Sequence, residues 1–131
     1  MLKCIAIDDE PLALRQITGY ISKIPYLELS ATFNNAIDAQ QRLTEEPADL
    51  IFADINMPDL NGVDFVRALP DRPMVIFTTA YSEYAVEGFK LDAVDYLLKP
   101  FSFADFSRSA AKANSLYELR QNRRSEPQET A

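Results

Sequence analysis

Short apolar runs rich in β-branched residues recur along the chain, which is typical of buried strands. We expect five strands, over residues 3–7, 27–33, 49–53, 73–79 and 93–98. The segments that follow them have helical spacing. The first begins after Pro11, which suits an initial helical turn, and places apolar side chains at residues 14, 17, 21 and 24. Further helices are expected over residues 35–45 with Asn34 or Asn35 as N-cap, over 63–69, over 83–90, and from 103 to about 120 with Ser102 as N-cap.

Strands that alternate with helices predict a parallel sheet with helices on both faces. The expected fold is therefore α/β and doubly wound, a flavodoxin-like (βα)5 arrangement with a five-stranded parallel sheet in the order 2-1-3-4-5. We expect this domain to span residues 1–120, and residues 121–131 to form a linker-like tail. The helix loses its apolar face there, and Arg120, Arg123 and Arg124 are expected to form a solvated helix end, with a basic partner contact as the alternative.

Composition excludes several kinds of chemistry. The 131 residues carry a formal net charge of −7 and include no histidine, which excludes a Ser-His-Asp triad and histidine metal ligands. The single cysteine, Cys4, stands in an apolar run and is expected to be an inert core thiol. The acidic balance argues against non-specific nucleic-acid binding. Without an apolar run of membrane-spanning length or a signal segment, a cytoplasmic location with no membrane partner is the default expectation.

Side chains that could act as ligands or reactants stand at four of the five expected strand ends. The second strand, expected at the far edge of the sheet, ends without such a group. Ligands of open α/β sheets bind at the carboxyl ends of the strands. The residues concerned are Asp8 and Asp9 after the first strand, Asp54 after the third, Thr78 and Thr79 at the end of the fourth, and Lys99 after the fifth.

These groups suit phosphoryl transfer to a carboxylate. Asp8, Asp9 and Asp54 cannot all be ionised together without a cost, and a divalent cation with oxygen ligands, Mg²⁺, relieves it. A carboxylate can attack phosphorus to give an aspartyl phosphate, and the reaction needs mainly positioning and charge neutralisation. Lys99 would supply a second cation and the Thr79 hydroxyl a hydrogen bond.

Each feature alone has a plainer interpretation. Asp8, Asp9 and Glu10 before Pro11 could be a helix N-cap with favourable charge. Tyr96 could be half-buried core, Lys99 a surface residue, and the threonines a strand end. Their convergence at one edge of the sheet favours a site.

The order of these residues resembles that of response-regulator receiver domains over residues 2 to about 120. The resemblance is carried by Asp8-Asp9, by Asp54 with Met57-Pro58 and Gly62, and by Thr79-Ala80, Tyr96 and Lys99-Pro100. The stretch FTTAYSEYAVEGFKLDAVDYLLKPF further resembles receivers of the LytTR subfamily (LytR/AlgR-like), which usually precede a DNA-binding domain.

The resemblance implies a role for each matching residue. Asp54 would accept phosphate from a sensor histidine kinase, with Mg²⁺ held by Asp9, Asp54 and the backbone carbonyl of Asn56, and by Asp8 mainly through water. Thr79 and Tyr96 would be the switch pair, and Lys99 would contact the phosphate and precede a cis peptide bond to Pro100. Asn56 and Tyr81 would tune dephosphorylation.

The resemblance also implies a signalling switch rather than an enzyme, apart from its self-catalysed phosphorylation and dephosphorylation. Its output would be a surface over the fourth helix, fifth strand and fifth helix, a possible homodimer face, and DNA contact would need an effector domain absent from this chain. Two alternatives stay open. The first is a phosphatase of the haloacid dehalogenase type, which would need an acidic residue at the position of Asn56. The second is a flavodoxin-like cofactor-binding module, which would need a loop rich in Ser, Thr and Gly after the first strand, where this chain is acidic.

Overall fold

The computed structural model describes residues 1–57, 62–69, 73–80 and 93–125, and within these ranges the side chains of residues 63 and 123–125 are not described. The elements are β1 (Leu2–Ile7), α1 (Pro11–Ser22), β2 (Leu27–Phe33), α2 (Ala36–Glu45), β3 (Leu50–Asp54), α3 (Gly62–Arg67), β4 (Met74–Thr79), β5 (Asp95–Leu98) and α5 (Phe103–Ser125). The helix expected over residues 83–90 lies outside the described residues, as do Pro58 and Tyr81.

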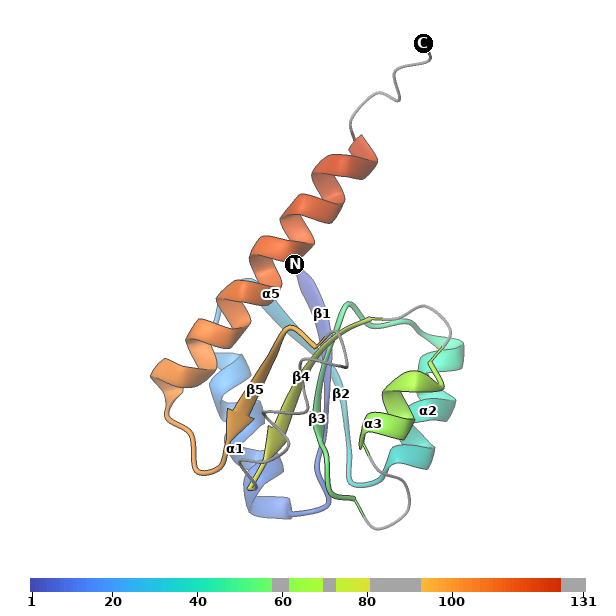
Figure 1. The fold of residues 1–131 in the computed structure, drawn as a ribbon, viewed down its shortest axis with the longest axis vertical. Coiled ribbons are helices and arrows are strands. Elements are labelled where there is room, and N and C mark those ends of the chain that lie inside the picture. Colours follow the sequence, from blue (N-terminus) through green and yellow to red (C-terminus); the bar gives the residue numbers. More distant parts are fainter. Residues whose placement is uncertain (58–61, 70–72, 81–92, 126–131) are drawn as a thin grey trace.

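All strand pairs are parallel, and the sheet has the order β2-β1-β3-β4-β5. Figure 1 shows α1 and α5 on one face of the sheet and α2 and α3 on the other, so the predicted doubly wound fold is confirmed. Because all five strands are parallel, their carboxyl ends lie at the same edge of the sheet.

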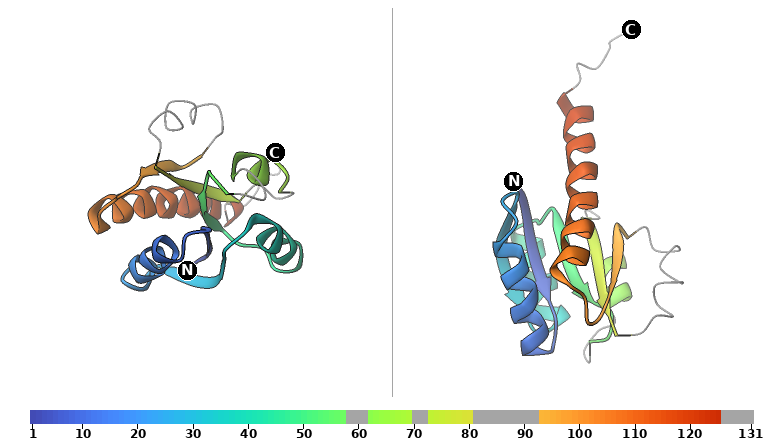
Figure 2. Two further views of the ribbon diagram at one scale, coloured as in Figure 1. Left: turned by 90° about the horizontal axis from the view of Figure 1, so that it is seen from below. Right: turned by 90° about the vertical axis from the view of Figure 1, so that its left-hand side faces the viewer.

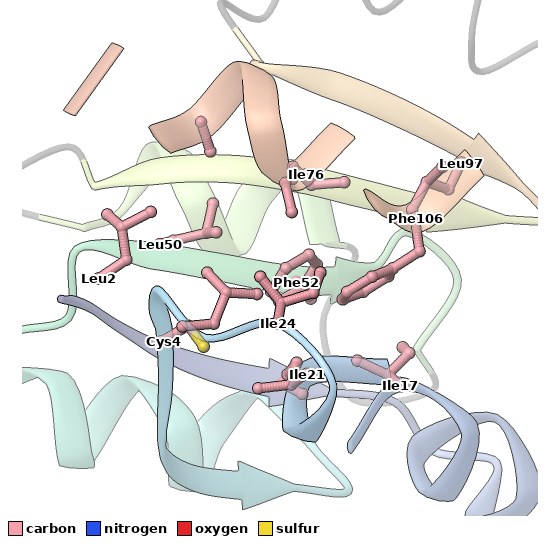
Figure 3. Packing of buried hydrophobic residues seen from close by; sticks show 14 of the residues in the cluster. Leu2, Cys4, Ile17, Ile21, Ile24, Leu50, Phe52, Ile76, Leu97 and Phe106 are labelled. Atoms are coloured by element: carbon pink, nitrogen blue, oxygen red, sulfur yellow. The ribbon is translucent and has the colours of Figure 1, made fainter. Parts of the chain in front are cut away.

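Each face of the sheet has its own core, because side chains alternate along the strands. Leu50 and Phe52 of β3 point to the α1 and α5 side, where Phe52 stacks on Phe106 at 4.9 Å between ring centroids (Figure 3). Ile51 and Ala53 point to the α2 and α3 side. β3 is buried throughout, which explains its unbroken apolar run and leaves Asp54 at the end of a buried central strand.

Local signals set the helix starts. Pro11 stands in the first turn of α1, the Asn35 side chain caps α2 by accepting the backbone N–H of Asp38 at 2.8 Å, and the Ser102 hydroxyl accepts the backbone N–H of Asp105 at 3.1 Å before α5. These predictions are confirmed. By contrast Glu10, the N-cap of α1, makes no side-chain capping bond, so capping does not explain the acidic triplet after β1.

Helix α5 continues to Ser125, past the boundary expected at residue 120. Figure 2 shows its second half leaving the sheet behind as it runs toward the C-terminus. The division into a domain and a tail stays a prediction. No helix within the described ranges is long and apolar enough to cross a bilayer.

Candidate functional site

Three carboxylates gather where β1 and β3 end. Asp8 and Asp9 follow β1, and Asp54 is the last residue of β3. Asp8, Asp9 and Asp54 each offer a carboxylate oxygen within 4.8 Å of the other two. Asp8 and Asp54 are buried, whereas Asp9 is exposed. Oxygen donors in such a cluster fit a hard divalent cation.

Lys99 brings a positive charge into this cluster from the end of β5. Its Nζ lies 2.8 Å from Asp8 Oδ2 and 3.6 Å from Asp54 Oδ2. Burial lowers the pKa of Lys99, but the hydrogen bond to Asp8 and the charge of Asp54 outweigh it, so the pKa is raised overall. Lys99 is therefore a cation at the site and not the surface residue that its position alone suggested.

Asp54 is held in an environment that disfavours its charge. Burial is the largest cause and the negative charge of Asp8 the next, and together they raise the pKa of Asp54 to about 7. Two effects oppose this rise: the positive charge of Lys99, and the backbone N–H of Asn56, which donates to Asp54 Oδ1 at 3.2 Å. In the described part of the chain, a cluster of three carboxylates thus holds one lysine against two of its members, and a bound Mg²⁺ would neutralise the remaining negative charge. The residues present fit that ion.

The backbone behind Asp54 is tightly packed against Gly62, the first residue of α3. A Cβ atom at Gly62 would lie 2.5 Å from the Asp54 carbonyl oxygen and 3.0 Å from Ile55 Cα. The Gly62 N–H also donates to the Ile55 carbonyl at 2.8 Å. Only glycine permits this approach, so α3 fixes the backbone that carries Asp54 and Asn56.

Thr79 and Tyr96 stand on neighbouring strands beside the cluster. Thr79 ends β4, is buried, and accepts the backbone N–H of Lys99 through its carbonyl at 2.7 Å. The Tyr96 ring packs on Phe77 at 5.4 Å between centroids, and burial raises the pKa of its hydroxyl. Among the described residues, the buried Tyr96 hydroxyl has no hydrogen-bond partner. The Lys99–Pro100 peptide bond is cis.

Asn56 is exposed at the cluster, whereas Cys4 takes no part in it. Cys4 is fully buried in β1, and burial raises the pKa of its thiol to about 12, as suits an inert core residue.

Three residues that contact β5 or the loop after it gave no signal in the sequence. Ser109 of α5 is buried and donates a hydrogen bond to Asp95 Oδ2, and Asp95 Oδ1 accepts the backbone N–H of Tyr96. Tyr20 of α1 contacts the loop after Lys99. These pairs are 14 and 81 positions apart, too far for any local pattern to link them.

The sequence matches a known family over most of its length. The family described as response regulator receiver domain matches residues 4–111. An uncharacterized response regulatory protein of Vibrio cholerae is 37% identical over 122 residues, which are 90% of this chain and 46% of that protein. The transcriptional regulatory protein YpdB of Escherichia coli K12 is 33% identical over 123 residues, 92% of this chain and 50% of that protein. The chain spans about half the length of these curated relatives.

The fold gives the same result. The crystal structure of the response regulatory domain of protein mrkE from Klebsiella pneumoniae is similar with a TM-score of 0.83 and 32% identity, covering 90% of this chain and 99% of that one. The acidic cluster with its lysine stands at the edge where the strands end. With a family match over residues 4–111 and this fold, the chain belongs to the response regulator receiver domains of two-component signalling.

Proposed function

We propose that Asp54 accepts a phosphoryl group from a phosphohistidine of a sensor histidine kinase, in a reaction that needs Mg²⁺. The proposal is carried by one observation: Lys99 reaches both Asp8 and Asp54 inside a cluster of three carboxylates. Asp54 combines the features of an acceptor, because it is fixed on a buried strand and its pKa is raised by burial and by Asp8.

In the proposed transfer, a carboxylate oxygen of Asp54 attacks phosphorus while the bond from phosphorus to the kinase imidazole breaks. The imidazole nitrogen keeps that electron pair and takes a proton from solvent, and an acyl phosphate forms on Asp54. An ionised carboxylate needs no general base. Lys99 and the Thr79 hydroxyl contact the phosphoryl oxygens, and a bound Mg²⁺ would neutralise charge on the carboxylates and on the phosphoryl group.

The cluster favours a division of labour between the two residues after β1. Asp8 is already engaged, since Oδ2 accepts from Lys99 and Oδ1 accepts the backbone N–H of Glu10 at 2.9 Å. Asp9 is exposed and open to an ion. We therefore assign Asp9, Asp54 and the Asn56 carbonyl as direct Mg²⁺ ligands, and Asp8 as a ligand through water.

Phosphorylation is proposed to act through Thr79 and Tyr96. The Thr79 hydroxyl moves toward the phosphoryl group and the Tyr96 ring follows it inward. The Tyr96 hydroxyl is buried without a hydrogen-bond partner among the described residues, which is unfavourable and supports a ring that can take a second position. Asn56 and Tyr81 are proposed to set the lifetime of the acyl phosphate.

The output is proposed to be control of transcription by an attached or partner effector of the LytTR type, with the receiver in the cytoplasm. One support is the stretch FTTAYSEYAVEGFKLDAVDYLLKPF. Another is the sensory transduction protein LytR of Staphylococcus haemolyticus, which is 33% identical over 114 residues, or 44% of its own length. A homodimer through the helix expected over residues 83–90, β5 and α5 would transmit the switch, and residues 121–131 would lead to the effector. The phosphatase and flavodoxin alternatives lose their basis once the family is known.

Intact mass spectrometry after incubation with acetyl phosphate tests the proposal. The parent and Asp54→Asn are compared with Mg²⁺ and with chelator. We expect one phosphoryl adduct on the parent, dependent on Mg²⁺ and labile to base, and none on Asp54→Asn. An adduct of equal yield on Asp54→Asn would show that another residue is the acceptor.

A further inference from the structure

We propose that Tyr20 of α1 is a positioning residue for Lys99, acting through the loop that joins β5 to α5. This inference rests on the proposed function, because its effect is read through phosphorylation and Mg²⁺ binding at Asp54. Neither residue neighbours the other in sequence.

The Tyr20 hydroxyl holds the loop directly. It donates a hydrogen bond to the carbonyl oxygen of Phe101 at 3.3 Å and accepts one from the Gln16 amide at 3.1 Å. Gln16 lies one helical turn before Tyr20, so the hydroxyl is oriented by its own helix toward the loop. Phe101 stands two positions after Lys99.

The Tyr20 ring holds the same segment by packing. Its centroid lies 6.2 Å from that of Phe101, 5.4 Å from Phe103 and 5.3 Å from Phe106. The Lys23 ammonium stands 5.4 Å from the Phe103 centroid and covers this aromatic group from the α1 side. Ring and hydroxyl make separable contributions, so removing the hydroxyl alone leaves the packing in place.

Lys99 is therefore fixed from two sides. On the β4 side its backbone N–H donates to the Thr79 carbonyl at 2.7 Å, and two residues later Tyr20 holds the Phe101 carbonyl. Between these anchors the side chain reaches Asp8 and Asp54. Loss of the second anchor lets the loop shift and carries the Lys99 Nζ away from the carboxylates.

A displaced Lys99 has two opposite consequences. Phosphoryl transfer slows, because Lys99 neutralises charge on the phosphoryl group. Mg²⁺ binds more tightly, because the carboxylates of Asp8 and Asp54 no longer share their charge with an ammonium group. A general loss of structure would weaken both, so the two readouts separate positioning from folding.

The test compares Tyr20→Phe with the parent, and uses Tyr26→Phe as the matched control. Tyr26 is another half-buried tyrosine against the same core, located just before β2. Phosphorylation by acetyl phosphate is timed by intact mass, and Mg²⁺ affinity is measured by calorimetry. For Tyr20→Phe we expect a rate about fivefold lower, the factor that one neutral hydrogen bond provides, together with tighter Mg²⁺ binding. Tyr26→Phe should match the parent in both.

Tyr20→Phe in a Lys99→Ala background completes a double-mutant cycle. In that background Tyr20→Phe should change neither the phosphorylation rate nor the Mg²⁺ affinity. A parent-like rate for Tyr20→Phe, unchanged or weaker Mg²⁺ binding, or an undiminished effect in Lys99→Ala would each overturn the inference. If the parent itself takes no phosphoryl group, the proposed function fails, and the Mg²⁺ measurements still decide the role of Tyr20: tighter binding that depends on Lys99 supports it, and equal binding overturns it.

Discussion

The Lys99 ammonium donates a hydrogen bond to Asp8 Oδ2 at 2.8 Å across a sequence separation of 91 residues. Asp8 is fully buried, whereas the Lys99 side chain keeps 19% of its surface exposed. The contact ties the first strand to the last segment before α5. Asp54 lies 3.6 Å from the same ammonium group, so its attraction to Lys99 is weaker than that of Asp8.

Lys99→Ala is expected to destabilise the metal-free protein, because it leaves the Asp8 carboxylate buried without its cation. Breaking a buried pair in this way costs about 3–5 kcal/mol. Unfolding by urea in chelator measures the loss, and Mg²⁺ should restore part of it. Lys112→Ala is the control, since Lys112 meets the partly exposed Asp95 at 3.2 Å and should cost less than about 1 kcal/mol. Equal losses for both variants would contradict the assignment.

Asp54→Asn is expected to stabilise the protein in chelator, in a manner that depends on pH. The pKa of Asp54 is raised from 3.8 to about 7 in the fold, so the native state binds more protons than the unfolded state between these values. The stability of the parent therefore falls as pH rises from about 4 to about 7, and asparagine removes that loss while keeping the oxygen that accepts the Asn56 N–H.

Melting temperatures of the parent and Asp54→Asn across this pH range check the prediction. At pH 8 the variant should have the higher melting temperature, by roughly 4 °C for each kcal/mol of added stability. The difference in melting temperature should vanish near pH 4. Saturating Mg²⁺ should stabilise the parent more than the variant. A lower melting temperature for Asp54→Asn at pH 8 in chelator would refute the charge argument.

Gly62→Ala is expected to destabilise the domain and to slow phosphorylation, because its Cβ would collide with backbone atoms of Asp54 and Ile55. Gly19→Ala is the matched control. Nothing lies within 4 Å of a Cβ at Gly19, which stands inside α1, so alanine there should stabilise by about 0.5–1 kcal/mol. Urea unfolding of both variants measures this, and equal effects would show that Gly62 has no special contact.

Thr78→Val is expected to leave stability unchanged or to raise it, since the buried Thr78 hydroxyl has no hydrogen-bond partner among the described residues. Ser109→Ala provides the contrast. Its buried hydroxyl donates to the charged Asp95, and its loss should cost about 1.5–3 kcal/mol. Chemical denaturation of the pair tests the difference, and a larger loss for Thr78→Val than for Ser109→Ala would contradict the prediction.

Much of the fold follows from sequence patterns, because β3 and β4 are buried on both faces and appear as continuous apolar runs. The sheet topology then brings Asp8, Asp54 and Lys99 to one edge, so these residues could be predicted from the strand ends. The strand expected from residue 93 begins at Asp95. Such shifts of boundary are small, because periodicity locates elements better than it locates their ends.

Contacts made by irregular segments could not be predicted. The bond from Tyr20 to the Phe101 carbonyl depends on the path of a loop, and the approach of Gly62 to Asp54 depends on how α3 meets β3. Helix α5 ends at Ser125 and not near residue 120, because the polar sequence of this solvated helix end carries no sharp stop signal.

Chemical mapping tests most directly whether Asp54 carries the phosphoryl group. Borohydride reduces an acyl phosphate to an alcohol, so an aspartyl phosphate becomes homoserine. After treatment with acetyl phosphate and Mg²⁺, reduction and peptide mass spectrometry, we predict homoserine at position 54 and an unmodified Asp8 and Asp9. Homoserine at either of those two positions, or at none of the three in protein that carries a phosphoryl adduct, would contradict the account.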